Sequence, residues 1–126
     1  MSTRASISID YGNKVVGIYN HHDGYLKGLG KTLKENYNSK EGFESIIELG
    51  DASCVEPKLE NSIFYTRDRD EDFEGTKPFE TNTYEEFYER MEQEYNYVFD
   101  VKKNKIRVFK GDISQRIEIT RKLNKI

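Results

Sequence analysis

The sequence predicts an α+β domain of two layers, in which a mainly antiparallel sheet carries three or four helices on one face. Two segments of alternating apolar and polar residues, each with a short turn inside it, predict a β-hairpin near either end of the chain. Between them, apolar residues spaced three and four apart predict helices. Because hairpins dominate over strand–helix–strand units, the strands are expected to pair mainly antiparallel. The 126 residues suffice for one domain, which we expect to span residues 1–126.

The N-terminal hairpin is predicted over residues 5–19. Apolar residues from Ala5 onward alternate with polar ones, as is typical of a strand with one buried face. Gly12 and Asn13 form a two-residue turn of the kind that closes hairpins, and residues 15–19 form the returning strand.

Two short helices are predicted after a glycine-rich loop at residues 20–30. Ser39 is placed to cap the N-terminus of the second helix, and Gly50 is placed to end it. On each helix, the apolar residues share one face. These residues are Leu26, Leu29, Leu33 and Tyr37 in the first helix, and Phe43, Ile46 and Ile47 in the second.

A third strand is predicted over residues 62–67, where it runs into the charged sequence Arg67-Asp68-Arg69-Asp70-Glu71. On a strand, successive side chains point to opposite faces, so Arg67 and Arg69 would share one face. Two arginines on one face are suited to bind a phosphate or a carboxylate. A solvated edge strand with self-paired charges is the alternative.

The C-terminal part of the chain is predicted to form a helix and a second hairpin. Thr83 and Glu86 have the spacing of a capping box, which predicts a helix over residues 84–95. The hairpin is expected over residues 97–109. Residues 112–123 fit either a strand or a helix, and the helix is favoured.

Charge is unevenly distributed along the chain. The net charge is only -3, but residues 51–100 carry five basic and fifteen acidic side chains, a net of -10, whereas residues 101–126 carry nine and two, a net of +7. Mutual neutralisation, in the fold or in an oligomer, is the simplest interpretation. The acidic segment could instead imitate a nucleic acid. General nucleic-acid binding is not expected of a net negative chain.

Composition excludes several classes of protein. No apolar run approaches the ~18 residues of a membrane span, and no apolar segment suggests a secretory signal. The single cysteine, Cys54, excludes an intrachain disulfide and a cysteine-rich zinc site. We therefore expect a soluble cytoplasmic protein that needs no cofactor and no metal.

The loop after the N-terminal hairpin contains both histidines of the chain, in the sequence His21-His22-Asp23-Gly24-Tyr25. Such a loop could bind a polar ligand, and a structural turn is the alternative. Lys27 and Lys31 could hold an anion near the start of the following helix, although the glycine spacing matches no dinucleotide or phosphate-loop motif.

The first part of the chain contains several short motifs. They are Ser2-Thr3-Arg4-Ala5, Gly17-Ile18-Tyr19, His21-x-Asp23-Gly24-Tyr25, Gly28-x-Gly30, Leu49-Gly50-Asp51 and Tyr65-x-Arg67-Asp68-Arg69. On these motifs, residues 2–72 resemble a family of small uncharacterised bacteriophage and prophage proteins. Members commonly have Trp, Pro and Gly where this chain has His22, Leu26 and Asp70. The resemblance implies a phage origin and an accessory role, for which opposing host defence in the bacterial cytoplasm is the commonest task.

The first functional hypothesis is therefore non-catalytic capture of a small anionic ligand, such as a nucleotide-derived defence signal. Its phosphates would pair with Arg67, Arg69 and Lys27, while Tyr25 would stack on a base and His21 and Asp23 would bind sugar hydroxyls. A homo-oligomer is expected, which would let Arg4 join the site. One alternative is an acidic nucleic-acid mimic that inhibits a host defence protein. The other is a metal-dependent phosphohydrolase using His21, Asp23, Asp68 and Asp70.

Overall fold

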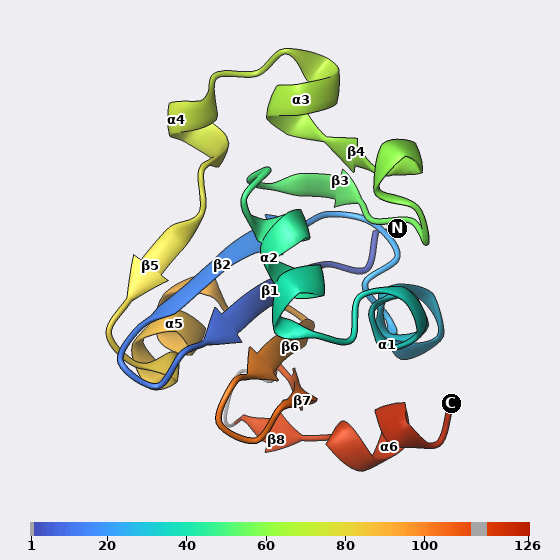
Figure 1. The fold of residues 1–126 in the computed structure, drawn as a ribbon, viewed down its shortest axis with the longest axis vertical. Coiled ribbons are helices and arrows are strands. Elements are labelled where there is room, and N and C mark those ends of the chain that lie inside the picture. The colour runs from blue at the N-terminus through green and yellow to red at the C-terminus, as the bar shows by residue number, and fades with distance from the viewer. Residues whose placement is uncertain (1, 112–115) are drawn as a thin grey trace.

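An eight-stranded, mainly antiparallel sheet forms the centre of the computed structural model, which describes residues 2–111 and 116–126 (Figure 1). The strands are β1 (Ala5–Asp10), β2 (Val15–Asn20), β3 (Ala52–Cys54), β4 (Ile63–Phe64), β5 (Phe79–Thr81), β6 (Tyr95–Asp100), β7 (Lys105–Lys110) and β8 (Ile117–Glu118). Their order is β4-β3-β2-β1-β6-β7-β8, and β5 pairs with β2 beside β3. The predicted α+β class is confirmed.

Helical segments fill most of the connections between strands. They are the π-helical turn η1 (Leu26–Gly30), α1 (Lys31–Asn36), α2 (Lys40–Ile47), the 3₁₀ turn η2 (Leu59–Asn61), α3 (Tyr65–Arg69), α4 (Phe73–Thr76), α5 (Tyr84–Met91) and α6 (Thr120–Asn124). In the described part of the chain, no helix has the length and apolar character needed to cross a membrane.

The two predicted hairpins are confirmed, and they meet through a parallel contact. β1 pairs antiparallel with β2, and β6 pairs antiparallel with β7. β1 also pairs parallel with β6, in a register that sets Ala5 beside both Asn20 and Tyr95. This contact brings the start of the chain next to residues about three-quarters of the way along it.

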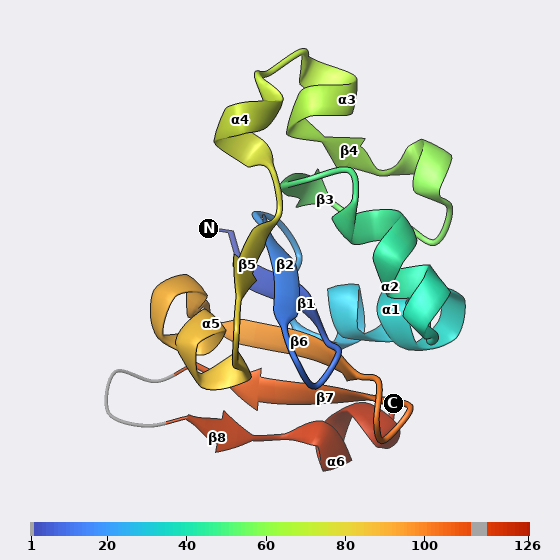
Figure 2. The same ribbon diagram turned by 60° about the vertical axis from the view of Figure 1, so that its left-hand side comes forward.

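Both faces of the sheet carry buried apolar residues. On one face, Ile7, Ile18 and Phe99 belong to the core that includes α1 and α2. On the other face, Val15 and Val98 belong to a second core around α5. Figure 2 shows α5 on one side of the sheet and α1 and α2 on the other. The helices therefore cover both faces, and the prediction that they would lie on one face is wrong. Val15 and Val98 give the second face apolar residues against which Phe87 of α5 packs, although β1 itself presents Ser6 and Ser8 there.

The predicted helix caps are present. The Ser39 side chain accepts a hydrogen bond from the Gly42 N–H at 2.9 Å, and Thr83 accepts one from the Glu86 N–H at 3.2 Å. These bonds satisfy backbone donors that a helix N-terminus leaves free. α5 ends at Met91, earlier than predicted, because the following residues turn into β6.

The predicted strand over residues 62–67 is wrong beyond Phe64. β4 contains only Ile63 and Phe64, and the chain then turns into α3. The Asp68 carboxylate accepts a hydrogen bond from the Phe64 N–H at 2.8 Å, which closes the first turn of this helix. Arg67 and Arg69 therefore project from a helix and do not share a strand face.

The prediction for residues 112–123 is partly tested. Residues 112–115 lie outside the described residues, whereas β8 and α6 account for most of the remainder. The Lys34 ammonium group donates hydrogen bonds to the carbonyls of Leu123, Asn124 and Ile126 at the end of α6. A cation at a helix C-terminus stabilises the helix because the last carbonyls are otherwise unpaired.

Candidate functional site

The candidate site lies where β1 and β6 begin and β2 ends. It is on the same face of the sheet as α5. Strand alternation places Arg4 on the same face as Ser8, which packs near Phe87 of α5. Continuing the registers of β1 by one residue sets Arg4 beside His21, which follows β2, and beside Glu94, which precedes β6. A cavity of about 430 Å³ opens here, and its lining residues are Ser2, Arg4, His21, Gln93 and Glu94.

Tyr19 connects the two basic residues of this cavity. It precedes His21 by two positions, so both side chains lie on the same face, and its hydroxyl oxygen is 2.6 Å from Nδ1 of His21. The Arg4 guanidinium lies near the same hydroxyl. Desolvation raises the pKa of Tyr19 more than the charge of Arg4 lowers it, so the phenol stays protonated beside both neighbours.

His22 extends the site toward the N-terminus. Its ring packs edge-on against the ring of His21, with the centroids 4.5 Å apart. Its Nδ1 atom is 2.8 Å from the hydroxyl oxygen of Ser2. Adjacent histidines that would point apart on a regular strand thus contact each other where β2 ends.

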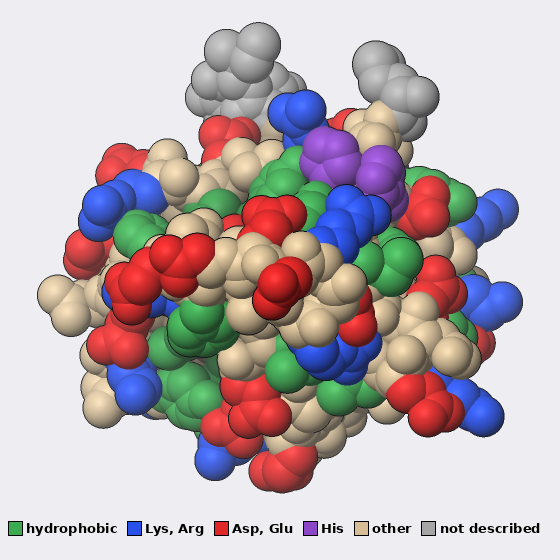
Figure 3. All heavy atoms as spheres, turned by 90° about the horizontal axis from the view of Figure 1, so that it is seen from above, with side chains coloured by type: hydrophobic (Ala, Val, Ile, Leu, Met, Phe, Trp, Pro, Cys, Tyr) green, Lys and Arg blue, Asp and Glu red, His purple; other side chains and the backbone are tan. Residues whose placement is uncertain are grey.

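Arg69 approaches the same region from α3. It donates a hydrogen bond to the buried Ser53 hydroxyl at 3.4 Å and stacks on the ring of Tyr65, 5.4 Å from its centroid. We call Arg4, His21, His22 and Arg69 the basic cluster. Figure 3 shows the two histidines together, with Lys or Arg side chains on two sides of them.

Among the described residues, no side chain of the basic cluster is paired with a carboxylate. Desolvation lowers the pKa of His21, and the charges of His22, Arg4 and Arg69 lower it further. Mutual repulsion of this kind favours binding of an anion.

Asp51 lies next to Tyr19 in this arrangement. Its carboxylate accepts a hydrogen bond from the Tyr19 N–H at 2.9 Å, which ties the segment before β3 to β2. Desolvation raises the pKa of Asp51 to about 6. The negative charge is therefore disfavoured at this position.

The structure separates the two arginines that the sequence placed together. Arg67 forms an ion pair with Asp68 at 2.9 Å and donates hydrogen bonds to the carbonyls of Leu59 and Ser62. Its guanidinium also lies over the ring of Phe64. Arg67 thus supports the turn before α3, and only Arg69 reaches toward the histidines.

The glycine-rich loop is bonded internally. The N–H groups of Gly28 and Gly30 donate to the Tyr25 carbonyl, and that of Leu29 donates to the Asp23 carbonyl. The buried Tyr97 hydroxyl holds the loop by donating to the Gly24 carbonyl at 2.7 Å. These backbone groups are consequently not free to bind a phosphate.

No hydrogen bond or ion pair among the described residues joins the other predicted residues of this loop to the basic cluster. Asp23 has a left-handed φ of 57° and acts electrostatically on Cys54, as Arg69 does. Tyr25 is 44% exposed. Lys27 and Lys31 are exposed as well.

A metal site is not assembled by the described residues. No group of three or more His, Cys, Asp and Glu side chains among them could hold a metal ion. Asp68 is occupied by Arg67 and by the Phe64 N–H. The combination of His21, Asp23, Asp68 and Asp70 therefore does not form the centre that a metal-dependent hydrolase needs.

Sequence analysis missed five residues of the site. Tyr19 could have been found, because it is two positions from His21 on a predicted strand. Ser2, Asp51, Gln93 and Glu94 reach the site through tertiary pairing, above all the parallel contact of β1 with β6. No local sequence pattern predicts the pairing of β1 with β6.

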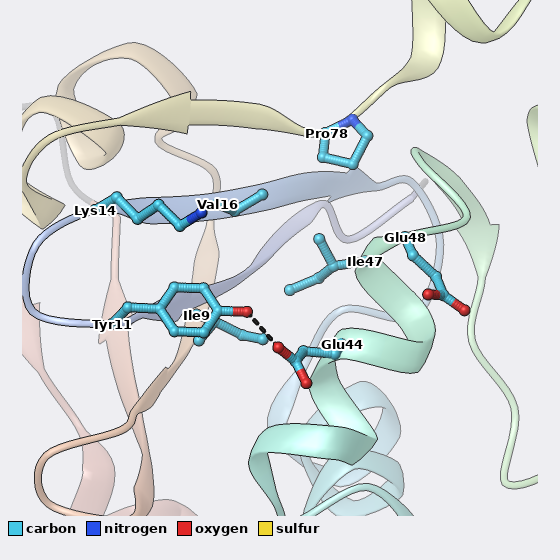
Figure 4. A pocket seen from close by; sticks show the side chains of 8 residues that line it. All are labelled: Ile9, Tyr11, Lys14, Val16, Glu44, Ile47, Glu48 and Pro78. Carbon is cyan, nitrogen blue, oxygen red and sulfur yellow. Dashed lines mark hydrogen bonds between the residues drawn. The ribbon is translucent and has the colours of Figure 1, made fainter.

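A second cavity, of about 420 Å³, lies between α2 and the hairpin of β1 and β2 (Figure 4). Its apolar lining comes from Ile9, Val16, Ile47 and Pro78. The Tyr11 hydroxyl at its rim donates to the Glu44 carboxylate at 2.6 Å. None of the residues predicted to bind a ligand lines this cavity, and its main polar pair is internally satisfied.

Comparison of the chain with protein-family models, with curated proteins and with solved structures gave no match. The phage origin suggested by short motifs in residues 2–72 therefore stays a prediction. The geometry of the basic cluster and the adjoining cavity carries the functional argument that follows.

Proposed function

We propose that the protein is a non-catalytic binding module that captures a small phosphate-bearing ligand at the basic cluster. The observation that carries this proposal is the convergence of Arg4, His21, His22 and Arg69 without an acidic partner among the described residues. A phosphate would relieve their mutual repulsion and accept charge-assisted hydrogen bonds from them.

The chemistry of the site supports binding over catalysis. The hydroxyl of Tyr19 is held between Arg4 and His21, and its raised pKa keeps it from acting as a nucleophile near neutral pH. His22 is bonded to Ser2, whose hydroxyl is the other candidate nucleophile. In the described part of the chain, neither imidazole forms a further hydrogen bond to an acidic group that would orient it, as activation of a nucleophile requires.

The biological role that fits this proposal is sequestration. On the resemblance to phage proteins, the ligand would be a nucleotide-derived signal of host defence, which a phage protein needs only to bind. Each site removes one signal molecule, so the affinity must be high and the protein abundant. A homo-oligomer would multiply the number of sites per particle.

The proposal is tested by calorimetry and thermal unfolding with adenosine mono-, di- and cyclic phosphates. At about 100 times its dissociation constant, a ligand adds about 2.7 kcal/mol to the free energy of unfolding. We expect Arg4→Gln and Arg69→Gln each to weaken binding about tenfold or more, because charge-assisted hydrogen bonds are lost.

Lys103→Gln is the matched control, since Lys103 is an exposed cation in the β6–β7 turn and only its N–H is bonded. The control should bind like the wild type. A wild-type protein that none of these phosphates stabilises, or a Lys103→Gln variant that loses as much affinity as Arg4→Gln, contradicts the proposal.

Nucleic-acid mimicry is the second candidate, and one observation favours it. Glu85, Glu86, Glu89 and Glu92 are all exposed along α5. However, Arg116 approaches Glu85 at 3.6 Å, so the basic end of the chain neutralises part of this surface. Inhibition of a host nuclease that weakens steeply with salt would support this candidate.

A further inference from the structure

The cavity beside the basic cluster has two chemically different sides. The Arg4 guanidinium and the His21 imidazole line one side, whereas Gln93 and Glu94 line the other. Lys110 binds the Glu94 Oε2 atom at 3.2 Å, and Oε1 accepts no hydrogen bond from the described residues. The side-chain amide of Gln93 is likewise unbonded within that part of the chain.

The segment that carries these two acceptors is held firmly. The buried Asn96 side chain accepts from the Gln93 N–H at 3.0 Å and donates to the Gln93 carbonyl at 2.8 Å. Ser6 of β1 donates to the same Asn96 oxygen at 2.8 Å. A buried, fully bonded amide of this kind fixes the backbone and so preorganises the groups that it supports.

A carboxylate at the edge of an anion site has a specific consequence. Glu94 repels a free phosphate, since both are negatively charged, but it accepts strong hydrogen bonds from hydroxyl groups. An amide such as that of Gln93 can donate and accept beside it. One side of the cavity thus favours an anionic group and the other favours hydroxyl groups. Together they select a ligand that carries both.

From this arrangement we infer that the ligand is the phosphate ester of a polyhydroxylated sugar, a class that includes nucleotides. The inference rests on the proposed function, since it assigns the phosphate to Arg4 and His21 and the sugar hydroxyls to Glu94 and Gln93. The cavity volume of about 430 Å³ lies in the range of small-molecule sites and exceeds the space that phosphate alone fills.

The test compares ribose 5-phosphate, inorganic phosphate and ribose as ligands of the wild type and of Glu94→Gln. The wild type should bind ribose 5-phosphate about tenfold or more tightly than inorganic phosphate. Glu94→Gln should weaken ribose 5-phosphate binding about fivefold or more, because the charged acceptor is lost. The same change should leave inorganic phosphate binding unchanged or tighten it, because a repulsive charge is removed.

Glu89→Gln makes the same charge change on the exposed side of α5 and is the matched control. Unfolding curves of each variant report whether loss of the Lys110 pair disturbs the fold. Equal affinity of the wild type for both phosphates, or a Glu94→Gln effect of the same sign on both, overturns the inference and leaves the proposed function standing. If neither phosphate nor any nucleotide binds, the proposed function itself fails.

Discussion

At the scale of single residues, function and stability meet at Asp51 and Tyr19. The Asp51 carboxylate accepts a hydrogen bond from the Tyr19 N–H, and the Tyr19 hydroxyl contacts Nδ1 of His21 and lies near Arg4. Tyr19 thus links the desolvated carboxylate of Asp51 to the two side chains proposed to bind the ligand. The Leu49-Gly50-Asp51 motif gives no local sign of this role, because the contact depends on how β2 and β3 meet.

We predict a pH effect for Asp51→Asn. The raised pKa, about 6, means that the folded protein holds this proton more tightly than the unfolded chain, whose Asp titrates near 3.9. The contribution of Asp51 is therefore present below about pH 4 and is lost as pH rises through about 6. Asn keeps the acceptor for Tyr19 without the charge.

Urea unfolding at about pH 4 and about pH 7.5 measures this effect. Relative to the wild type, Asp51→Asn should gain stability at the higher pH. The exposed carboxylate of Glu60 offers a control, Glu60→Gln, for which the gain should be absent. A free-energy difference between Asp51→Asn and the wild type that stays constant with pH would contradict the prediction.

At the scale of elements, local patterns predicted what local interactions build. Alternation and a two-residue turn predicted the β1–β2 hairpin, and capping residues predicted the starts of α2 and α5. α3 could not be predicted, because it is held by hydrogen bonds from Arg67 to the carbonyls of Leu59 and Ser62, which no sequence pattern indicates. The parallel β1–β6 contact, which completes the site, joins segments remote in sequence.

The packing of α5 on the sheet depends on a glycine. A Cβ atom at Gly17 would lie 2.5 Å from Cζ of Phe87 and 2.6 Å from Cβ of Ser8. Gly17→Ala should therefore lower the free energy of unfolding by about 1–3 kcal/mol, as overpacking does. Gly75→Ala is the control, since nothing lies within 4 Å of a Cβ there. Urea denaturation should show the loss in Gly17→Ala alone, and equal stabilities of the two variants would refute the packing argument.

At the scale of the whole molecule, side chains of the acidic segment, residues 51–100, form ion pairs with side chains of the basic segment, residues 101–126, within one chain. Arg107 approaches Asp100 at 3.6 Å, Lys110 approaches Glu94 at 3.2 Å, and Arg116 approaches Glu85 at 3.6 Å. The hairpin of β6 and β7 brings two of these pairs together. Part of the charge that was expected to drive self-association is thus neutralised inside the subunit.

The homo-oligomer stays a prediction, and the mass of the particle in low and high salt tests it. If the remaining charge drives assembly, light scattering at tens of micromolar protein should show a mass above 14.8 kDa in low salt that falls toward it in high salt. A mass of 14.8 kDa in low salt would exclude the oligomer. A larger mass that salt does not change would replace the charge argument with an apolar interface.

The central claim is that the basic cluster is built to receive a phosphate, and the titration of its histidines tests this most directly. Desolvation, and after it the neighbouring positive charges, lower the pKa of His21, so a bound anion should raise it. Nuclear magnetic resonance can follow both imidazole rings during a pH titration, with and without saturating ribose 5-phosphate. We predict that the ligand raises the pKa of His21 and that Arg4→Gln abolishes the response. Binding that leaves the pKa of His21 unchanged would contradict the claim.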